Sequence, residues 1–190
     1  MVTAVILAGG NSKRMGRDKL ELDFGGRTML QSVVDRFGAE FGEVCISVAD
    51  PEKYAGIATR RITDILPGAG PLSGLHAALS QTRADGVFLV AADLPYAEPR
   101  AAKRIIELRG DCEACLIMLP DGKLEPLFGY YGNSLLGRCE EAILSGEFRM
   151  TEIIRNSAVR YVDISELGDL WDDKLILNIN TPNDYQKLLG

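Results

Sequence analysis

The chain has 190 residues, of which 46% are hydrophobic and 25% charged, which is ordinary for a soluble globular protein with a sizeable core. Its 21 basic and 27 acidic residues give a formal net charge of −6, which argues against a broad nucleic-acid-binding face. The sequence contains no apolar run of membrane-spanning length and does not begin like a signal peptide. We therefore expect a cytoplasmic protein that binds neither nucleic acid nor a membrane.

The opening segment combines a buried strand with a small-residue turn and basic side chains. Residues 2–7 are apolar and rich in β-branched side chains, which predicts a strand buried on both faces of a parallel sheet. Ala8-Gly9-Gly10 lets the backbone approach a ligand closely and turn its N–H groups toward one anion. Basic residues follow within ten positions of Gly10: Lys13, Arg14, Arg17 and Lys19. This pattern predicts a polyphosphate loop, and the alternative is a plain turn beside a solvated basic face.

Two common phosphate-binding motifs are absent. A P-loop requires Gly-Lys followed by Ser or Thr, and that combination does not occur. A dinucleotide fingerprint requires G-x-G-x-x-G after the first strand, which Gly9-Gly10 does not supply. A Rossmann-type oxidoreductase is therefore a poor interpretation.

The rest of the chain alternates between strand and helix patterns. The predicted strands cover 20–24, 44–48, 61–63, 86–92, 112–119, 124–131, 159–164 and 175–179. The predicted helices cover 28–37, 74–82, 100–108, 133–145 and 150–156, and a last one begins at Thr181-Pro182. Thr28 and Asn133 are expected to cap two of these helices, and Asp121-Gly122 predicts a hairpin. The pattern predicts one α/β domain over 1–190: a three-layer α/β/α, Rossmann-like fold whose mostly parallel sheet contains one antiparallel strand.

Two aspartates follow predicted strands. Asp64 precedes a loop stiffened by Pro67 and Pro71, which can hold one shape over a ligand. Asp93 follows a buried strand, and open α/β sheets bind ligands at the carboxyl ends of their strands. Asp93 is therefore the leading metal-ligand candidate, although either aspartate could be an ordinary capping carboxylate.

Other chemistry-bearing residues have mainly structural interpretations. His76, the single histidine, is expected to be a packed or solvated helix residue, with a substrate contact as the alternative. The four cysteines do not resemble a disulfide framework. Cys112 and Cys115 lie three apart in a predicted strand, where they face opposite sides, so we expect structural thiols rather than a metal pair.

The motif at 7–19, L-A-G-G-N-S-K-R-M-G-R-D-K, resembles the opening of the sugar-phosphate and cofactor nucleotidyltransferases. Four later motifs make the chain similar, more narrowly, to the molybdenum cofactor guanylyltransferases. They are P-G-A-G-P-L-S-G-L at 67–75, D-L-P at 93–95, E-P-L-F at 125–128 and N-I-N-T-P-N-D at 178–184. These motifs span nearly the whole chain.

The resemblance implies roles for individual residues. Nucleotide-binding residues would be Leu7, Ala8 and Gly9 through their backbone, together with Lys19, Asp64 and Asp93. Asp93 would also hold Mg²⁺, and Arg14, Lys19 and Asp93 would form the catalytic set. Asn180 would lie near the metal or the pterin phosphate, and Glu125 either contacts the pterin or belongs to a strand-edge break at Glu125-Pro126.

The implied reaction transfers GMP from GTP to the terminal phosphate of molybdopterin and releases pyrophosphate, and molybdoenzyme maturation proteins are possible partners. Many relatives carry an asparagine that helps to hold guanine near the end of the strand at 44–48, and by our placement Ser47 stands there. This departure leaves CTP, or another phosphorylated acceptor, as an alternative substrate. A nucleotide-binding assembly protein without catalysis is a further alternative, against which Arg14, Lys19 and Asp93 together argue.

Overall fold

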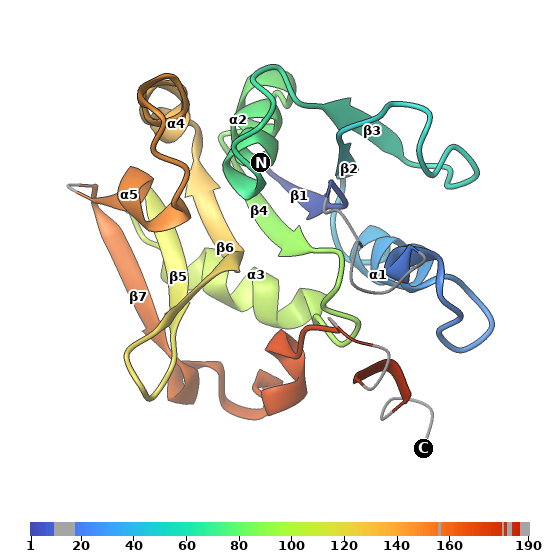
Figure 1. Cartoon of the computed structure of the whole chain (residues 1–190). Coiled ribbons are helices and arrows are strands. Elements are labelled where there is room, and N and C mark those ends of the chain that lie inside the picture. The colour runs from blue at the N-terminus through green and yellow to red at the C-terminus, as the bar shows by residue number, and fades with distance from the viewer. Residues whose placement is uncertain (10–17, 156, 180, 182–183, 187–190) are drawn as a thin grey trace.

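The computed structural model describes residues 1–9, 18–155, 157–179, 181 and 184–186. Seven strands form one sheet in the order β3-β2-β1-β4-β6-β5-β7 (Figure 1). The strands are β1 (Val2–Leu7), β2 (Val44–Val48), β3 (Arg60–Thr63), β4 (Gly86–Ala91), β5 (Ala114–Met118), β6 (Leu124–Gly132) and β7 (Val159–Asp163). The α-helices are α1 (Met29–Gly38), α2 (Pro71–Gln81), α3 (Pro99–Leu108), α4 (Leu136–Ser145) and α5 (Met150–Ile154). Short 3-10 helices are η2 (Lys19–Glu21), η3 (Asn133–Leu135), η4 (Ile164–Leu170) and η5 (Asp173–Ile176).

Helices cover both faces of the sheet, as the sequence predicted. Helices α1 and α3 cover one face of the sheet, and α2, α4 and α5 cover the other (Figure 1). The buried side chains of each group pack with the strand side chains of their own face. All six residues of β4 are buried, which explains why its sequence is apolar without alternation. The antiparallel strand is also confirmed, because β6 pairs antiparallel with both β4 and β5 while the other pairings are parallel.

The predicted strand at 20–24 is wrong. Residues 19–21 form η2, because the Asp18 carboxylate accepts the Leu20 N–H at 3.1 Å and caps a helical turn. Only Asp23 pairs in a strand-like way, through an isolated bridge to Thr28. Thr28 caps α1 as predicted, since its hydroxyl accepts the Gln31 N–H at 3.1 Å.

The predicted strand at 175–179 is also wrong. The Asp172 carboxylate accepts the Lys174 N–H at 2.8 Å and starts η5, so the apolar run turns instead of extending. Asn178 is exposed outside any strand, and Asn180 lies outside the described residues. Nearby, the Thr181 hydroxyl accepts the Asp184 N–H at 3.2 Å, which is the predicted capping arrangement.

The start of α4 also differs from the prediction. Asn133 belongs to η3 instead of capping the helix, and the position that precedes α4 is Leu135, which makes no side-chain cap.

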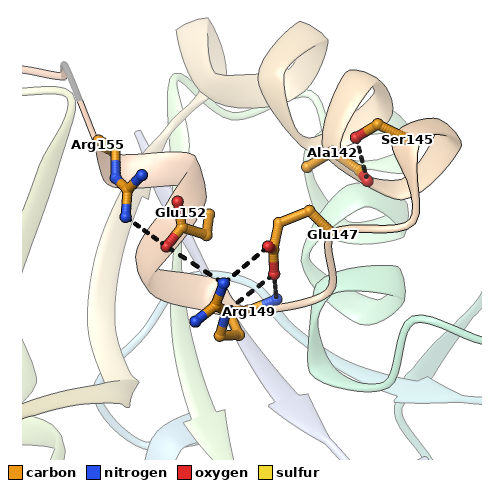
Figure 2. Close-up of polar contacts among 6 residues, drawn as sticks. All are labelled: Ala142, Ser145, Glu147, Arg149, Glu152 and Arg155. Carbon is orange, nitrogen blue, oxygen red and sulfur yellow. Dashed lines mark hydrogen bonds and ion pairs between the residues drawn. The ribbon is translucent and has the colours of Figure 1, made fainter.

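Ion pairs connect the residues that follow α4. Arg149 pairs with Glu147 at 3.0 Å and lies 3.9 Å from Glu152 (Figure 2). Glu152 also pairs with Arg155 at 2.8 Å. Because the arginines are exposed, we expect these pairs to organise the α4–α5 turn but to add little stability.

Cys112 is half-buried and precedes β5 instead of lying in it, whereas the other three cysteines lie in packed positions. Cys45, Cys115 and Cys139 are buried with free thiols, and burial raises their pKa values to about 11, about 12 and about 12. The Cys115 thiol donates to the Ile105 carbonyl at 3.3 Å. These are the features of inert structural thiols. In the described part of the chain, no helix is both long enough and apolar enough to cross a bilayer.

Gly86 begins β4 where the backbone of β6 comes close. A Cβ added there would lie 2.7 Å from the Tyr131 carbonyl oxygen and 2.6 Å from the Tyr130 hydroxyl. We expect Gly86→Ala to lower the free energy of unfolding by about 1–3 kcal/mol, because backbone atoms must move to admit the methyl group. Urea denaturation measures the effect.

Gly137 is the matched control for that substitution. It lies on α4, and a Cβ added there meets no atom within 4 Å. Gly137→Ala should raise stability by about 0.5–1 kcal/mol, because alanine is the better helix former. Equal effects of the two substitutions would contradict this account of the packing.

Candidate active site

The carboxyl ends of three neighbouring parallel strands build the site. Leu7 of β1 is in register with Ser47 of β2 and with Ala91 of β4. Beyond β1, the Ala8 N–H donates to the Ser47 carbonyl at 2.8 Å, and the Ala92 N–H donates to the Leu7 carbonyl at 3.1 Å. From β1 the chain continues to β2 and β3 on one side, whereas β4 lies on the other side of β1. The sheet therefore has its topological switch point between β1 and β4, where open α/β sheets bind ligands.

These contacts restrict how the opening loop can bind a nucleotide. The Ala8 N–H and the Leu7 carbonyl are already occupied by neighbouring strands, so they fix the path of the loop. Gly9 is exposed beyond them, and its backbone is the part that can face a ligand. Gly10 and Arg14 lie outside the described residues, so their predicted roles stay predictions.

Lys19 and Asp93, which lie 74 positions apart, meet at this edge. The Lys19 Nζ atom is 2.6 Å from Asp93 Oδ2, and it also donates to the Ile179 carbonyl at 2.9 Å. Their side chains are 15% and 22% exposed. The Ile179 N–H donates in turn to the Asp93 carbonyl at 3.1 Å. The opening, central and closing motifs therefore converge on one partly buried ion pair.

Asp64 lies at the same edge, but farther along the sheet. Three strand spacings separate β3 from β4, which is about 14 Å. Burial raises the pKa of the Asp64 carboxyl, and the nearby charge of His76 opposes that shift. The predicted nucleoside contact of Asp64 stays a prediction.

The loop between Asp64 and α2 is held by a side chain of α2, that of Ser73. The Ser73 hydroxyl accepts the Ala69 N–H at 3.0 Å and donates to the Leu66 carbonyl at 2.6 Å. Gly68 and Gly70 take φ values of 101° and 59°, which side-chain-bearing residues rarely adopt. The prediction of a stiff loop is supported up to Gly70, but the helix begins earlier than predicted, because Pro71 occupies the first turn of α2.

His76 is buried, with 5% of its surface exposed, which agrees with a packed helix residue. Its Nδ1 atom has no hydrogen-bond partner among the residues that the structure describes. A buried polar atom without a partner costs free energy, so the alternative of a substrate contact stays open.

Ser47 lies near the end of β2, in register with Leu7, as the sequence analysis placed it. It is 3% exposed, and its Oγ atom lies 3.0 Å from where a Cβ on Gly74 would stand. The side chain is therefore packed beneath α2, and the effect of Ser47 on the choice of base stays a prediction. The backbone of Ala49 lies closer to the ligand edge, because its nitrogen is 3.9 Å from a Cβ built on Gly9.

Glu125 is a second carboxylate beside Asp93. It lies near the start of β6, which runs antiparallel to β4 and so begins next to the carboxyl end of that strand. Burial raises the pKa of Glu125, the Leu127 N–H lowers it, and the charge of Asp93 raises it further. The sequence signal was a glutamate at the head of an apolar strand, but only the antiparallel register brings it to Asp93.

The raised pKa of Glu125 predicts a pH-dependent stability effect. The folded state binds the proton more tightly than the unfolded state, so stability falls as the pH rises above the ordinary value of 4.5. Glu125→Gln keeps an oxygen for the Leu127 N–H and removes the charge. We expect the variant to be slightly more stable than wild type at pH 8 and equal to it near pH 4.

Urea midpoints at the two pH values measure this effect. Glu140→Gln, at an exposed position of α4, serves as the control and should show no such pH dependence. A Glu125→Gln variant that is less stable than wild type at pH 8 would overturn the assignment.

The mostly parallel sheet, with Gly9 after β1 and the Lys19–Asp93 pair at its carboxyl edge, agrees with the nucleotidyltransferase fold that the sequence motifs indicated. The family model described as the MobA-like NTP transferase domain matches residues 4–162. The chain belongs to this family, and it is a nucleotidyltransferase.

Individual relatives agree with that assignment. A probable molybdenum cofactor guanylyltransferase from Pelotomaculum thermopropionicum is 33% identical over 97% of this chain and 90% of its own length. The crystal structure of molybdopterin-guanine dinucleotide biosynthesis protein A from Archaeoglobus fulgidus has the same fold, with a TM-score of 0.84 at 24% identity over 98% of this chain and 96% of its own. A Mycobacterium tuberculosis protein solved as a complex with manganese matches with a TM-score of 0.69 at 20% identity, over 99% of this chain and 97% of its own.

Proposed function

We propose that the protein transfers GMP from GTP to the terminal phosphate of molybdopterin, giving molybdopterin guanine dinucleotide and pyrophosphate. An oxygen of the acceptor phosphate attacks the α-phosphorus of GTP, and the bond between the α-phosphorus and its bridging oxygen to the β-phosphate breaks. The names of the curated relatives support the substrates. The observation that carries the proposal is the Lys19–Asp93 pair, which the closing segment contacts at Ile179.

The residues divide the work between positioning and charge stabilisation. The backbone at Gly9 and the carboxyl of Asp64 would bind the two ends of the nucleotide. Lys19, with Arg14 from the opening motif, would meet the negative charge that develops on the α-phosphate and on the leaving pyrophosphate. A phosphate monoester is already an anion near neutral pH, so the acceptor needs no general base.

Asp93 and Glu125 form a donor set that suits a divalent cation. Both are oxygen ligands, and the charge of Asp93 adds to the burial that raises the pKa of Glu125, so a cation beside them would be favoured. We propose Mg²⁺, and the relative solved with manganese supports the use of a divalent ion. When bound, the ion supplies neutralisation of phosphate oxygens. In the described residues no cluster of three or more metal-ligating side chains occurs, so phosphate oxygens and water would complete the coordination.

Further expectations belong to this proposal. A single domain over 1–190, a cytoplasmic location and delivery of the product to molybdoenzyme maturation proteins are all part of it. The free thiols of the chain favour a reducing compartment.

Calorimetric titration of GTP, CTP, ATP and UTP in the presence of Mg²⁺ tests the proposal. GTP should bind selectively, and binding should weaken when Mg²⁺ is omitted. Preference for CTP would keep the reaction class and change the substrate, which the replacement of the expected asparagine near Ser47 makes a specific alternative. Binding of none of the four would favour an assembly protein without catalysis.

A further inference from the structure

Asp18 stands directly before Lys19, yet the proposed chemistry gives it no role. Its Oδ2 atom accepts a hydrogen bond from the Tyr54 hydroxyl at 2.7 Å and lies 2.7 Å from the Lys53 Nζ atom. The Asp18 side chain is only 16% exposed. Two residues of the loop after β2, Lys53 and Tyr54, therefore bind the carboxylate of Asp18, the residue directly before Lys19.

The other oxygen of the same carboxylate organises η2. Asp18 Oδ1 accepts the Leu20 N–H at 3.1 Å and caps the turn that carries Lys19. Lys19 then reaches Asp93 Oδ2 and the Ile179 carbonyl. One uninterrupted series of contacts therefore runs from Tyr54 through Asp18 to the ion pair.

The backbone of Tyr54 is held in an unusual conformation. Its φ is 58°, and among the described residues no other side-chain-bearing residue has a positive φ. That conformation crowds the Cβ atom against the backbone and costs energy. The Ile57 N–H donates to the Tyr54 carbonyl at 3.0 Å, and the Lys53 ammonium lies 4.8 Å from the centre of the Tyr54 ring. Strain of this kind persists where the surrounding contacts require it.

Electrostatics explain why Asp18 needs both partners. Burial alone would raise the pKa of the Asp18 carboxyl, but the hydrogen bonds from Lys53 and Tyr54 outweigh burial and leave the pKa lowered. A lowered pKa means that the carboxylate stays ionised at neutral pH, and its contribution to stability is lost only as the pH falls below about 4. An ionised carboxylate beside a phosphate site would repel the substrate unless its charge were neutralised, and Lys53 neutralises it.

We propose that Tyr54 and Lys53 are positioning residues for nucleotide binding, which hold Asp18 and thereby set Lys19 toward the phosphates. The inference rests on the proposed function, because the nucleoside triphosphate is the ligand that Lys19 would meet. Neither residue needs to touch the nucleotide. Their effect passes through the carboxylate of Asp18.

Tyr54→Phe removes one hydroxyl and keeps the ring. We expect the Kd for GTP with Mg²⁺ to rise roughly fivefold to twentyfold, because a hydrogen bond to a charged group is lost. In an Asp18→Asn background the same substitution should have much less effect, since the acceptor charge is already gone. Calorimetry of the four proteins gives the double-mutant cycle, and thermal melting records stability in parallel.

Tyr161→Phe is the control, because Tyr161 lies 41% exposed on β7 at the far edge of the sheet. It should leave both Kd and Tm unchanged. An unaltered Kd for Tyr54→Phe, a fall in Tm alone, or full additivity with Asp18→Asn would overturn the inference. If the wild-type protein binds a different nucleoside triphosphate, the proposed substrate is wrong. The Kd values of the double-mutant cycle are then measured with the nucleotide that binds, and the same criteria apply.

Discussion

Replacing Asp93 with asparagine is expected to lower kcat/KM for nucleotidyl transfer about a thousandfold, the scale seen when one strong charge interaction in a transition state is removed. Asparagine has nearly the same shape, so the change is mainly one of charge. It removes the anion that pairs with Lys19 at 2.6 Å and the proposed ligand of the divalent ion. Steady-state kinetics with GTP and molybdopterin measure the effect.

The control separates catalysis from folding. Asp169→Asn alters an exposed carboxylate on η4 and should keep full activity. Asp93→Asn should remain folded but melt at a lower temperature, because the Lys19 ammonium loses its carboxylate and keeps the Ile179 carbonyl at 2.9 Å. Retained activity in Asp93→Asn would show that the proposed site is misplaced, whatever the melting temperature.

The ion pair between Asp93 and Lys19 is consistent with the proposed function. Each group lies partly out of water, so leaving either one alone would cost more than pairing them. The pair holds both side chains at the strand ends. Under the proposed function, phosphate oxygens would replace Asp93 as the partner of the Lys19 ammonium, and the carboxylate would then be available to a cation.

The sequence predicted most of the sheet because its strands carry strong local signals. The strand that became β4 is apolar throughout, and the Asp121-Gly122 turn fixes the direction of β6. The two failures, at 20–24 and 175–179, have one physical cause. In each case an aspartate side chain, Asp18 or Asp172, caps the backbone and starts a helical turn, which apolar periodicity does not reveal.

The candidate site was predictable to the extent that it depends on strand ends. Asp64 directly follows β3 and Asp93 lies two residues beyond β4, so parallel topology places them at one edge. The contribution of Glu125 depends on an antiparallel register, and the packing of Ser47 depends on where α2 crosses β2. The hydrogen bond from Tyr54 to Asp18 joins the side chains of residues 36 positions apart. No periodicity in the sequence indicates such a contact.

Lys19→Met is expected to reduce kcat about a hundredfold to a thousandfold, because it removes one cation from the developing charge on the phosphates and keeps a side chain of similar length. The Kd for GTP should also weaken, since the ammonium would bind ground-state phosphate oxygens as well. Single-turnover kinetics at saturating GTP separate the two effects. Lys103→Met is the control, because Lys103 forms a surface pair with Glu40 at 2.6 Å and should be dispensable.

The double variant decides whether the two residues act together. If Lys19 and Asp93 serve one transition state as a unit, the loss in Lys19→Met/Asp93→Asn should fall well short of the product of the single losses. Lys19→Met leaves Asp93 without its cation at 2.6 Å, so part of its cost is an unpaired carboxylate. Removing that carboxylate in the double variant relieves this cost. If the loss of activity in the double variant instead equals the product of the two single losses, the contact is structural and each residue acts independently.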